Sequence, residues 1–316
     1  CEHPPLLPKL PKLPAGRVLQ AYQRASRRLV VTDYDGTLTQ MQSLPRLATP
    51  APVVTQLLAT LSRDPRNTVY VVSGRERRFM EKWLGRLKVG LAAEFGFCHR
   101  APGSEEWTSL GRDLDTSWKD VVRPIMQYFA ERTPGTYIES KESSLAWHYR
   151  DADPHFGAWQ AKDMQIHMED VMSTLPLEII QGNRLVEVRH VGVNKSLVLE
   201  EVLRQGPRNG YDPPPPSRSE DSPAAEVPAE DFDFVLCVGD DRSDEDMYQL
   251  LKSWHARRLD AMDHEDDRAP DLYNVHIGPG ATHAEFCLES VVELRKILRG
   301  MAATSLKDSR TRRRGF

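Results

Sequence analysis

The stretch 30-VVTDYDGTLT-39 places two aspartates, Asp33 and Asp35, where a run of aliphatic residues ends. The β-branched residues before Asp33 are typical of a short buried strand. Because successive side chains of a strand point to opposite faces, a spacing of two residues puts both carboxylates on the same side. The glycine at position 36 lets the backbone come close to a ligand. The stretch therefore predicts a strand that presents two acids at one edge of a sheet.

Strand and helix signals alternate in the first third of the chain and again near its end. Further apolar strands are expected at 67–75, where the strand ends in Ser-Gly, and at 88–96, 232–241 and 273–278, the last of these closing the sheet. Helices are expected at 51–62, 76–84, 194–205 and 285–298. Such alternation favours a parallel sheet with right-handed crossovers. We therefore expect an α/β core.

The middle of the chain has a different pattern, helix, hairpin, helix, hairpin. It predicts a small α+β domain in which two helices lie on one face of an antiparallel sheet. The full prediction is a proline-rich linker at 1–24, a core at 25–111 and 191–300 with a long surface loop at 206–231, an inserted cap domain at 112–190 and a basic, solvated tail at 301–316. The loop prediction rests on four consecutive prolines among small polar residues.

The composition excludes several classes of protein. The 316 residues carry a net charge of −4, which favours neither a nucleic-acid-binding protein nor an acidic tail protein. The four cysteines form no C-x-x-C pair, so no zinc or redox motif is visible. No stretch approaches the ~20 apolar residues of a membrane helix, and no signal peptide is visible, so we expect a cytoplasmic protein without a membrane partner. The linker-like start suggests a fragment from the C-terminal side of a longer protein.

Four polar motifs fall at expected strand ends or at a helix start. They are Asp33–Thr37, Ser73–Arg75, Lys195, and Gly239–Asp241 with Asp244. In an open parallel sheet, function collects at the carboxyl ends of the strands, so these motifs are expected to meet. Converging carboxylates repel one another unless a hard cation lies among them, and Mg²⁺ prefers oxygen ligands.

This set of residues suits a phosphoryl group. Mg²⁺ and Lys195 would neutralise its oxygens, while Ser73 and backbone N–H groups would hydrogen-bond them. One aspartate can attack phosphorus to give an aspartyl-phosphate, and the other can protonate the leaving oxygen and later deprotonate water.

Each motif taken alone has an ordinary structural explanation. D-x-D-G-T can be a turn or a cap, although an EF-hand is excluded because its glycine would stand at loop position six and here stands fourth. Ser-Gly is a common turn, and a lysine at a helix start usually faces solvent. Gly239–Asp244 can be the capped start of an acidic helix. The order of the four motifs, and their placement at strand ends, favour the catalytic interpretation.

Together, the four motifs resemble those of the haloacid-dehalogenase-like phosphatase superfamily. The resemblance implies a Rossmann-like core with a cap inserted after the second motif, where the α+β domain is expected. It implies Asp33 as nucleophile, Asp35 as acid/base, and Mg²⁺ held by Asp33, the Asp35 carbonyl and Asp240, with Asp241 and Asp244 close by. Thr37, Ser73 and Lys195 complete the implied catalytic set.

Strings in the core and the cap sharpen the resemblance. Several strings between about Arg28 and Leu298 are similar to those of the trehalose-6-phosphate phosphatase family. They are "DYDGTL", "VVSGR", "AEFG", "ESK" followed by "AWHYR", "VEVR", "GVNKS" and "GDDRSDEDM". The resemblance implies a substrate-binding set of Gly36, Gly74, Arg75, Glu94, Glu139, Lys141, Arg150 and Glu187. The four cap residues of this set can equally be cross-strand ion pairs, and His148 is expected to pack rather than to catalyse. Phe95 departs from the family, which commonly has histidine there.

The resemblance implies an Mg²⁺-dependent hydrolase that converts trehalose 6-phosphate to trehalose and phosphate. The long loop at 206–231 and the linker-like start suggest the fungal arrangement, in which such a domain follows a synthase-like region, so synthase subunits are candidate partners. Two alternatives stay open. One is a phosphatase for sucrose 6-phosphate or mannosyl-3-phosphoglycerate, and the other is a non-catalytic regulatory subunit of a trehalose-synthesising complex.

Overall fold

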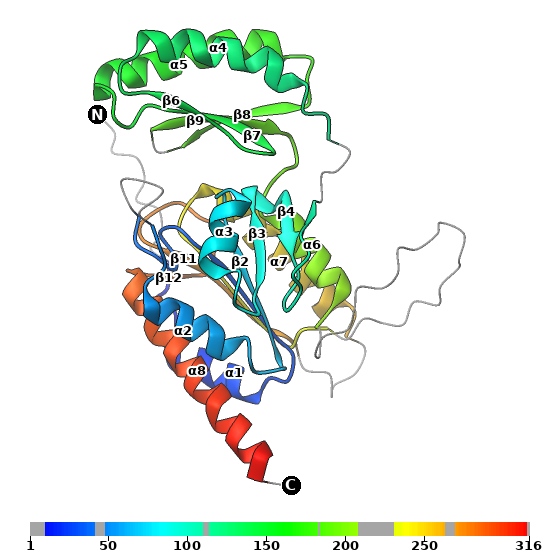
Figure 1. Ribbon diagram of the computed structural model, residues 1–316. Helices are drawn as coiled ribbons and strands as arrows, with labels where there is room; N and C mark the ends of the chain where they lie inside the picture. Colours follow the sequence, from blue (N-terminus) through cyan, green and yellow to red (C-terminus); the bar gives the residue numbers. More distant parts are fainter. Residues whose placement is uncertain are drawn as a thin grey trace, which may run out of the picture.

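Two separate β-sheets form the framework of the computed structural model (Figure 1), which describes residues 10–41, 48–109, 114–182, 184–207, 231–262 and 269–314. The larger sheet has eight strands in the order β12-β11-β10-β1-β2-β3-β4-β5, and the smaller has four in the order β6-β7-β9-β8. Among the described residues, no helix is both long and apolar enough to cross a membrane.

Six neighbouring strands of the larger sheet, from β12 to β3, pair in parallel. The two strands at the other edge, β4 and β5, pair antiparallel. The strands of this sheet are β1 (Arg28–Asp33), β2 (Asn67–Val72), β3 (Gly90–Ala93), β4 (Cys98–Arg100), β5 (Thr108–Ser109), β10 (Phe234–Gly239), β11 (Asp271–Ile277) and β12 (Phe286–Leu288). β1 lies between β2 and β10, with Asp33 paired to Val72 and Thr32 to Val238. The carboxyl ends of β1, β2 and β10 therefore meet at one edge.

Helices cover both faces of this sheet, which explains the continuous apolar runs in its strands. One face carries α1 (Ala15–Arg24), α2 (Pro52–Leu61), α3 (Arg77–Leu84) and α8 (Val291–Arg314), and the other carries α6 (Ser196–Gln205) and α7 (Glu245–Asp260). Alternate residues of β1 enter the two apolar clusters, Val30 on one side and Leu29 and Val31 on the other. Asp33 shares the face of Leu29 and Val31, and thus lies on the side of α6 and α7.

The smaller sheet is the cap. It consists of β6 (Tyr137–Ser140), β7 (Ser144–His148), β8 (Leu177–Gly182) and β9 (Leu185–His190), all antiparallel, with helices α4 (Trp118–Arg132) and α5 (Pro154–Met172). Both helices lie on the sheet face turned away from the core (Figure 1), and a third apolar cluster around the buried Trp147 fills the space between them and the sheet. The predicted fold class, an α/β core with an inserted α+β cap, is confirmed.

The predicted linker and tail are wrong where the structure describes them. Residues 15–24 form α1, whose Val18 and Tyr22 are completely buried. At the other end, α8 runs on through 301–314 and buries Met301 and Ser305. Both segments carry apolar residues at helical spacing. The prediction gave more weight to the prolines before residue 15 and to the arginines after residue 309 than to this spacing.

The end of the sheet also differs from the prediction. The segment Phe286–Leu288 forms the edge strand β12, so β11 is not the last strand, and α8 begins at Val291 rather than near 285. Three residues carry too little periodicity to separate a strand from a helix start. Most of the predicted loop at 206–231 lies outside the described residues. So do Asn183, at the turn of the second predicted cap hairpin, and the side chains of the arginines in the predicted tail.

A buried ion pair supports the start of β1. Arg28 is fully buried, and its Nη1 donates to Asp64 Oδ2 at 3.2 Å. Burial by itself would raise the pKa of Asp64, but hydrogen bonds from Arg66 and Ser305 outweigh it, so that the pKa is lowered. A lowered pKa in the folded state means that the ionised carboxylate stabilises the fold above the unfolded-state pKa, and that this stability is lost as the pH falls through the folded-state value.

We therefore expect Asp64→Asn to lower the free energy of unfolding at pH 7 by about 2–4 kcal/mol, because Arg28 keeps its charge without a counter-ion. The difference from the wild type should shrink below about pH 4, where an ordinary aspartate is protonated. Urea unfolding at several pH values measures both effects. Glu289→Gln, which removes the exposed partner of Lys12, is the control and should leave stability unchanged. An equal loss at pH 3 and pH 7 would contradict the electrostatic explanation.

Candidate active site

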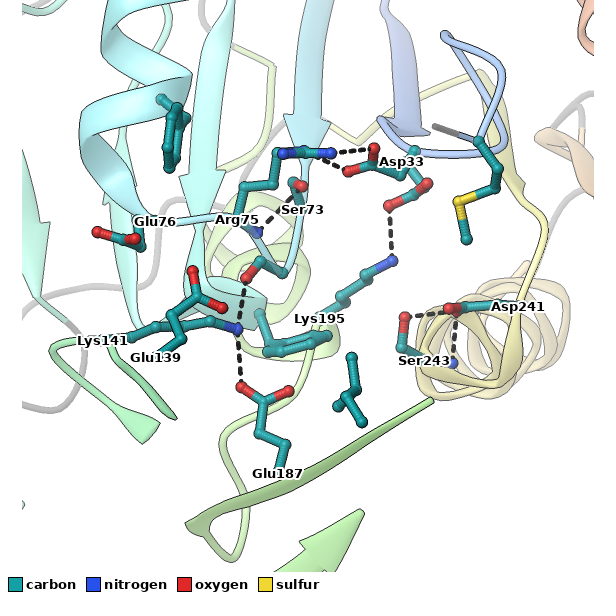
Figure 2. Close-up of a pocket in the computed structure, with 16 residues that line it drawn as sticks. Asp33, Ser73, Arg75, Glu76, Glu139, Lys141, Glu187, Lys195, Asp241 and Ser243 are labelled. Atoms are coloured by element: carbon teal, nitrogen blue, oxygen red, sulfur yellow. Dashed lines mark hydrogen bonds and ion pairs between the residues drawn. The ribbon is translucent and has the colours of Figure 1, made fainter. Parts of the chain in front are cut away.

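A cavity of about 180 Å³ lies between the carboxyl edge of the core sheet and the cap (Figure 2). Core and cap both contribute charged side chains to it. Its lining includes most of the predicted site residues, namely Asp33, Asp35, Ser73, Gly74, Arg75, Glu139, Lys141, Glu187, Lys195 and Asp241. The structure thus brings together motifs that are up to 208 positions apart in the chain, from Asp33 to Asp241.

Lys195 is the central cation of the core side. Its Nζ donates to Asp33 Oδ1 at 2.7 Å and to Asp244 Oδ1 at 2.8 Å, and all three residues are buried. Burial opposes the charged form of Lys195, but Asp244 and Asp33 raise its pKa well above the usual value. Lys195 therefore stays an ammonium and does not serve as a base.

Three carboxylates form a cluster that fits a metal ion. Among the described residues, one oxygen each of Asp33, Asp240 and Asp244 lie within 4.8 Å of one another. Burial, followed by the charges of Asp244 and Asp241, raises the pKa of Asp240 to about 7. One ammonium cannot balance three carboxylates, of which Asp33 and Asp244 are buried, and an all-oxygen donor set of this kind fits a hard divalent cation such as Mg²⁺.

Two predicted metal residues have other partners. The carboxylate of Asp241 accepts hydrogen bonds from Ser243 N–H at 2.8 Å and Ser243 Oγ at 2.6 Å, and so caps the 3-10 helix η3 (Arg242–Asp244). The carboxylate of Asp35 is paired with Arg75, which does not affect its predicted ligand atom, the backbone carbonyl oxygen. Neither side chain belongs to the three-carboxylate cluster of the described residues.

Gly36 and Thr37 fix the position of Asp240. Gly36 has a φ of +76°, and a Cβ built there would overlap the Asp240 carboxylate. The Thr37 hydroxyl donates to Asp240 Oδ1 at 3.1 Å. The loop after β1 therefore needs glycine at position 36 both for its left-handed backbone and for the close approach of the acid.

The segment after β2 holds the second acid of the opening motif. Arg75 donates from Nε at 2.6 Å and from Nη2 at 2.5 Å to the two oxygens of Asp35, a bidentate pair. The buried Ser73 Oγ accepts the backbone N–H of Arg75 at 3.2 Å. The guanidinium of Arg75 also lies 5.1 Å from the Trp83 ring centroid, which helps to keep it in place.

The cap side of the cavity carries Glu139, Lys141 and Glu187. Lys141 Nζ donates to Glu187 Oε1 at 2.8 Å, and Ser144 Oγ donates to the same oxygen at 2.6 Å. Glu139 Oε2 lies 2.8 Å from His148 Nε2. Burial alone would raise the pKa of Glu139, but the His148 hydrogen bond and the Lys141 charge lower it to about 2. His148 also stacks on the ring of Tyr137, with the ring centroids 4.5 Å apart, so it both packs within the cap, as expected, and hydrogen-bonds the pocket residue Glu139.

Three predicted substrate residues, Gly36, Glu94 and Arg150, lie outside the cavity lining. Arg150 follows β7, and neither it nor Glu94 belongs to the cavity lining. Glu94 is buried and accepts hydrogen bonds from the cap turn at Glu142 and Ser143.

Other lining residues were not predicted as site residues. They are Met41, Glu76, Phe79, Phe95, Leu185 and Ser243. The signal for Glu76 and Phe79 was their place directly after Ser73–Arg75, at the start of a helix that leaves the same strand end. Burial raises the pKa of Glu76, the hydrogen bond from Arg78 opposes this, and the carboxylate of Glu139, which lines the same cavity, adds to the increase.

The parallel core, the cap inserted after the second motif and the buried Asp33–Lys195 pair define a haloacid-dehalogenase-like hydrolase. The sequence profile of the trehalose-phosphatase family matches residues 31–267, and the chain belongs to this family. The predicted family and the predicted enzyme class, a phosphoric monoester hydrolase, are confirmed.

Individual relatives agree with this assignment. A trehalose-phosphatase of Schizosaccharomyces pombe is 40% identical over 245 residues, which cover 77% of this chain and 28% of that protein. A probable trehalose-phosphate synthase of Arabidopsis thaliana is 36% identical over 307 residues, or 96% of this chain and 33% of that protein. The C-terminal domain of the C. albicans trehalose-6-phosphate phosphatase superimposes with a TM-score of 0.82 at 34% identity, covering 93% of this chain and 99% of that domain. The chain spans about a third of the length of the curated relatives it matches.

We expect Gly36→Ala to lower phosphate release by at least about 100-fold, because the new Cβ displaces the Asp240 carboxylate from the cluster. Gly103→Ala is a matched control, since Gly103 has a φ of +75° but no atom within 4 Å of a Cβ. Both variants place alanine at a similar positive φ, so the control separates the effect of backbone strain from the overlap with Asp240, and only Gly36→Ala should lose activity. Full activity in Gly36→Ala would show that Asp240 does not need this position.

Proposed function

We propose that this chain is an Mg²⁺-dependent phosphatase that hydrolyses trehalose 6-phosphate to trehalose and phosphate, the last step of trehalose biosynthesis. The observation that carries the proposal is one continuous cavity with two chemically distinct ends. Asp33 and Lys195 lie at the core end, and Glu139, Lys141 and Glu187 lie at the cap end. The first end suits a phosphoryl group and the second suits the hydroxyls of a sugar.

Asp33 is the proposed nucleophile. Lys195 holds one oxygen of its carboxylate and thereby orients the other toward phosphorus. Attack forms an O–P bond between Asp33 and the phosphoryl group, and the bond from phosphorus to the sugar oxygen breaks. Water then attacks the same phosphorus, which releases phosphate and restores the Asp33 carboxylate.

Asp35 is the proposed acid and base. It gives a proton to the leaving sugar oxygen in the first step and takes one from the attacking water in the second, so that protons balance over the cycle. Because Arg75 occupies both of its oxygens, Asp35 must release at least one of these hydrogen bonds before it carries a proton. The phosphoryl group is a suitable alternative partner for Arg75.

The metal is proposed to bind at Asp33 and Asp240, with Asp244 close by and the Asp35 carbonyl as a further ligand. When bound, Mg²⁺ supplies positive charge that keeps the carboxylates ionised and neutralises the phosphoryl oxygens. Lys195 and Thr37 hold Asp33 and Asp240 in place for it.

The setting of the reaction is also proposed. The described cysteines, Cys98, Cys237 and Cys287, are free thiols, which is consistent with the reducing cytosol. The similarity to proteins named as trehalose-phosphate synthases supports synthase polypeptides as partners in a larger complex. Retention of Asp33, Asp35, Lys195 and Asp240 favours an active enzyme over a non-catalytic subunit.

A panel of sugar phosphates, assayed with and without Mg²⁺, tests the substrate. We expect phosphate release from trehalose 6-phosphate in the presence of Mg²⁺, little release from sucrose 6-phosphate or mannosyl-3-phosphoglycerate, and none after chelation. Preference for one of the other two substrates would replace the proposed one. Binding of trehalose 6-phosphate without turnover would support the regulatory role.

Asp33→Asn is expected to lower turnover at least ~1,000-fold, because an amide cannot attack phosphorus. The fold should survive, since the amide oxygen still accepts from Lys195. Asp163→Asn changes a partly exposed acid on cap helix α5, outside the cavity lining, and is the control that should retain full activity. An active Asp33→Asn protein would reject Asp33 as the nucleophile.

A further inference from the structure

The cap turn 141–143, between β6 and β7, is held by a carboxylate of the core. Glu94 Oε1 accepts the Glu142 N–H at 3.2 Å, and Glu94 Oε2 accepts the Ser143 N–H at 2.8 Å and the Ser143 hydroxyl at 2.7 Å. Glu94 is 2% exposed and Ser143 is 4% exposed. These three bonds use both oxygens of Glu94, which explains why it does not face the cavity. We call this contact the latch.

The core side of the latch belongs to the same backbone as the phosphate end of the cavity. Glu94 and Phe95 adopt left-handed φ values of 50° and 58°. The Glu94 N–H donates to Arg75 O at 2.9 Å, and the Phe95 N–H donates to Ser73 O at 3.0 Å. Since non-glycine residues in this conformation cost of order 1–3 kcal/mol each, the surrounding contacts must hold them there.

The cap side of the latch leads directly to the sugar end of the cavity. Lys119 of α4 donates to the carbonyls of Lys141 at 2.7 Å and Glu142 at 2.6 Å, so the turn is fixed from within the cap as well. The Lys141 side chain reaches from this turn to Glu187 and, at 3.2 Å, to the carbonyl of Gly74 (Figure 2). The position of the turn therefore determines where the Lys141 ammonium lies.

The cap has to move for a large substrate to bind. The cavity of about 180 Å³ is smaller than the roughly 300–1,000 Å³ of pockets that bury ligands of drug size. A disaccharide phosphate thus needs the cap to lift, and lifting it breaks the bonds from Glu94 to Glu142 and Ser143. Core and cap have separate apolar clusters, so each stays folded while they part.

We propose that Glu94 is a positioning residue that latches the cap onto the core, so that closure sets Lys141 and Glu139 over a phosphoryl group held at Asp33. The expected size of the substrate rests on the proposed function, whereas the latch itself does not. A small aryl phosphate that fits the core end reacts without the cap contacts. The latch therefore raises activity toward the sugar phosphate selectively.

Glu94→Ala and Glu94→Gln test this with two substrates. With p-nitrophenyl phosphate, kcat/KM should stay within about twofold of the wild type. With trehalose 6-phosphate, kcat/KM should fall about 10- to 100-fold in Glu94→Ala, as for a misplaced binding group, and less in Glu94→Gln, whose amide oxygen still accepts a hydrogen bond. An equal loss with both substrates, or no loss with trehalose 6-phosphate, would overturn the latch.

Ser143→Ala removes one of the three hydrogen bonds from the cap side. It should lower kcat/KM for trehalose 6-phosphate, relative to kcat/KM for p-nitrophenyl phosphate, by a smaller factor than Glu94→Ala does. Combined with Glu94→Ala it should add nothing, because both changes break one contact. Ser140→Ala is the matched control, since its hydroxyl lies on the same hairpin and binds Arg123 instead. Full additivity of Glu94→Ala and Ser143→Ala would reject the contact between them.

Hydrogen exchange tests the latch independently of any substrate. The Glu142 and Ser143 amides should be protected in the substrate-free protein and should exchange faster in Glu94→Ala, while the core strands keep their protection. Unchanged exchange at these two amides would overturn the proposal even if activity falls. If the wild type does not hydrolyse trehalose 6-phosphate, the proposed function fails, and the exchange result still decides the latch.

Discussion

The active-site end of the molecule depends on one buried ammonium, that of Lys195, between the carboxylates of Asp33 and Asp244. Charges taken out of water are costly unless they are paired and hydrogen-bonded, so this contact constrains three elements at once. It ties the end of β1, the start of α6 and η3 to a single point. Loss of the ammonium would leave three carboxylates facing one another in a buried site. The position of Lys195 is thus a condition both for the fold at this edge and for any chemistry there.

The remaining residues of the site are divided between the core and the cap. The core fixes the groups that suit a phosphoryl ester in general, because parallel strands bring their polar ends to one edge. The cap supplies Glu139, Lys141 and Glu187, which the core chemistry does not need. Selectivity among phosphate esters therefore has to come from the cap, and it is expressed only when the cap is in place over the core.

Three of the four core motifs follow apolar strands and the fourth, Lys195, stands at a helix start, so the hydrophobic periodicity of the sequence was enough to predict where they lie in the fold. For Lys141 and Glu187 the sequence left two interpretations open, a substrate site implied by the family resemblance and an ion pair, and the structure pairs the two residues with each other in the lining of the cavity. The sequence was insufficient for Glu94, because two of its three hydrogen bonds come from backbone N–H groups of a distant turn, and backbone donors carry no sequence signal. It failed for α1 and the end of α8, where flanking prolines and arginines outweighed a short apolar period. The ion pair between Asp35 and Arg75 could not be predicted either, because it depends on the orientation of the two side chains, which the sequence does not specify.

The location of Glu94 connects the two bodies in a specific way. Its backbone is bonded to the carbonyls of Ser73 and Arg75, and its side chain is bonded to the turn that carries Lys141. A shift of the Ser73–Arg75 segment on phosphoryl binding would move Glu94, and with it the turn. Because coupling between two sites is reciprocal, closure of the cap would in turn favour the arrangement of this segment that holds the phosphoryl group. Recognition of the sugar and of the phosphate would then reinforce each other through one carboxylate, although neither end of the ligand touches it.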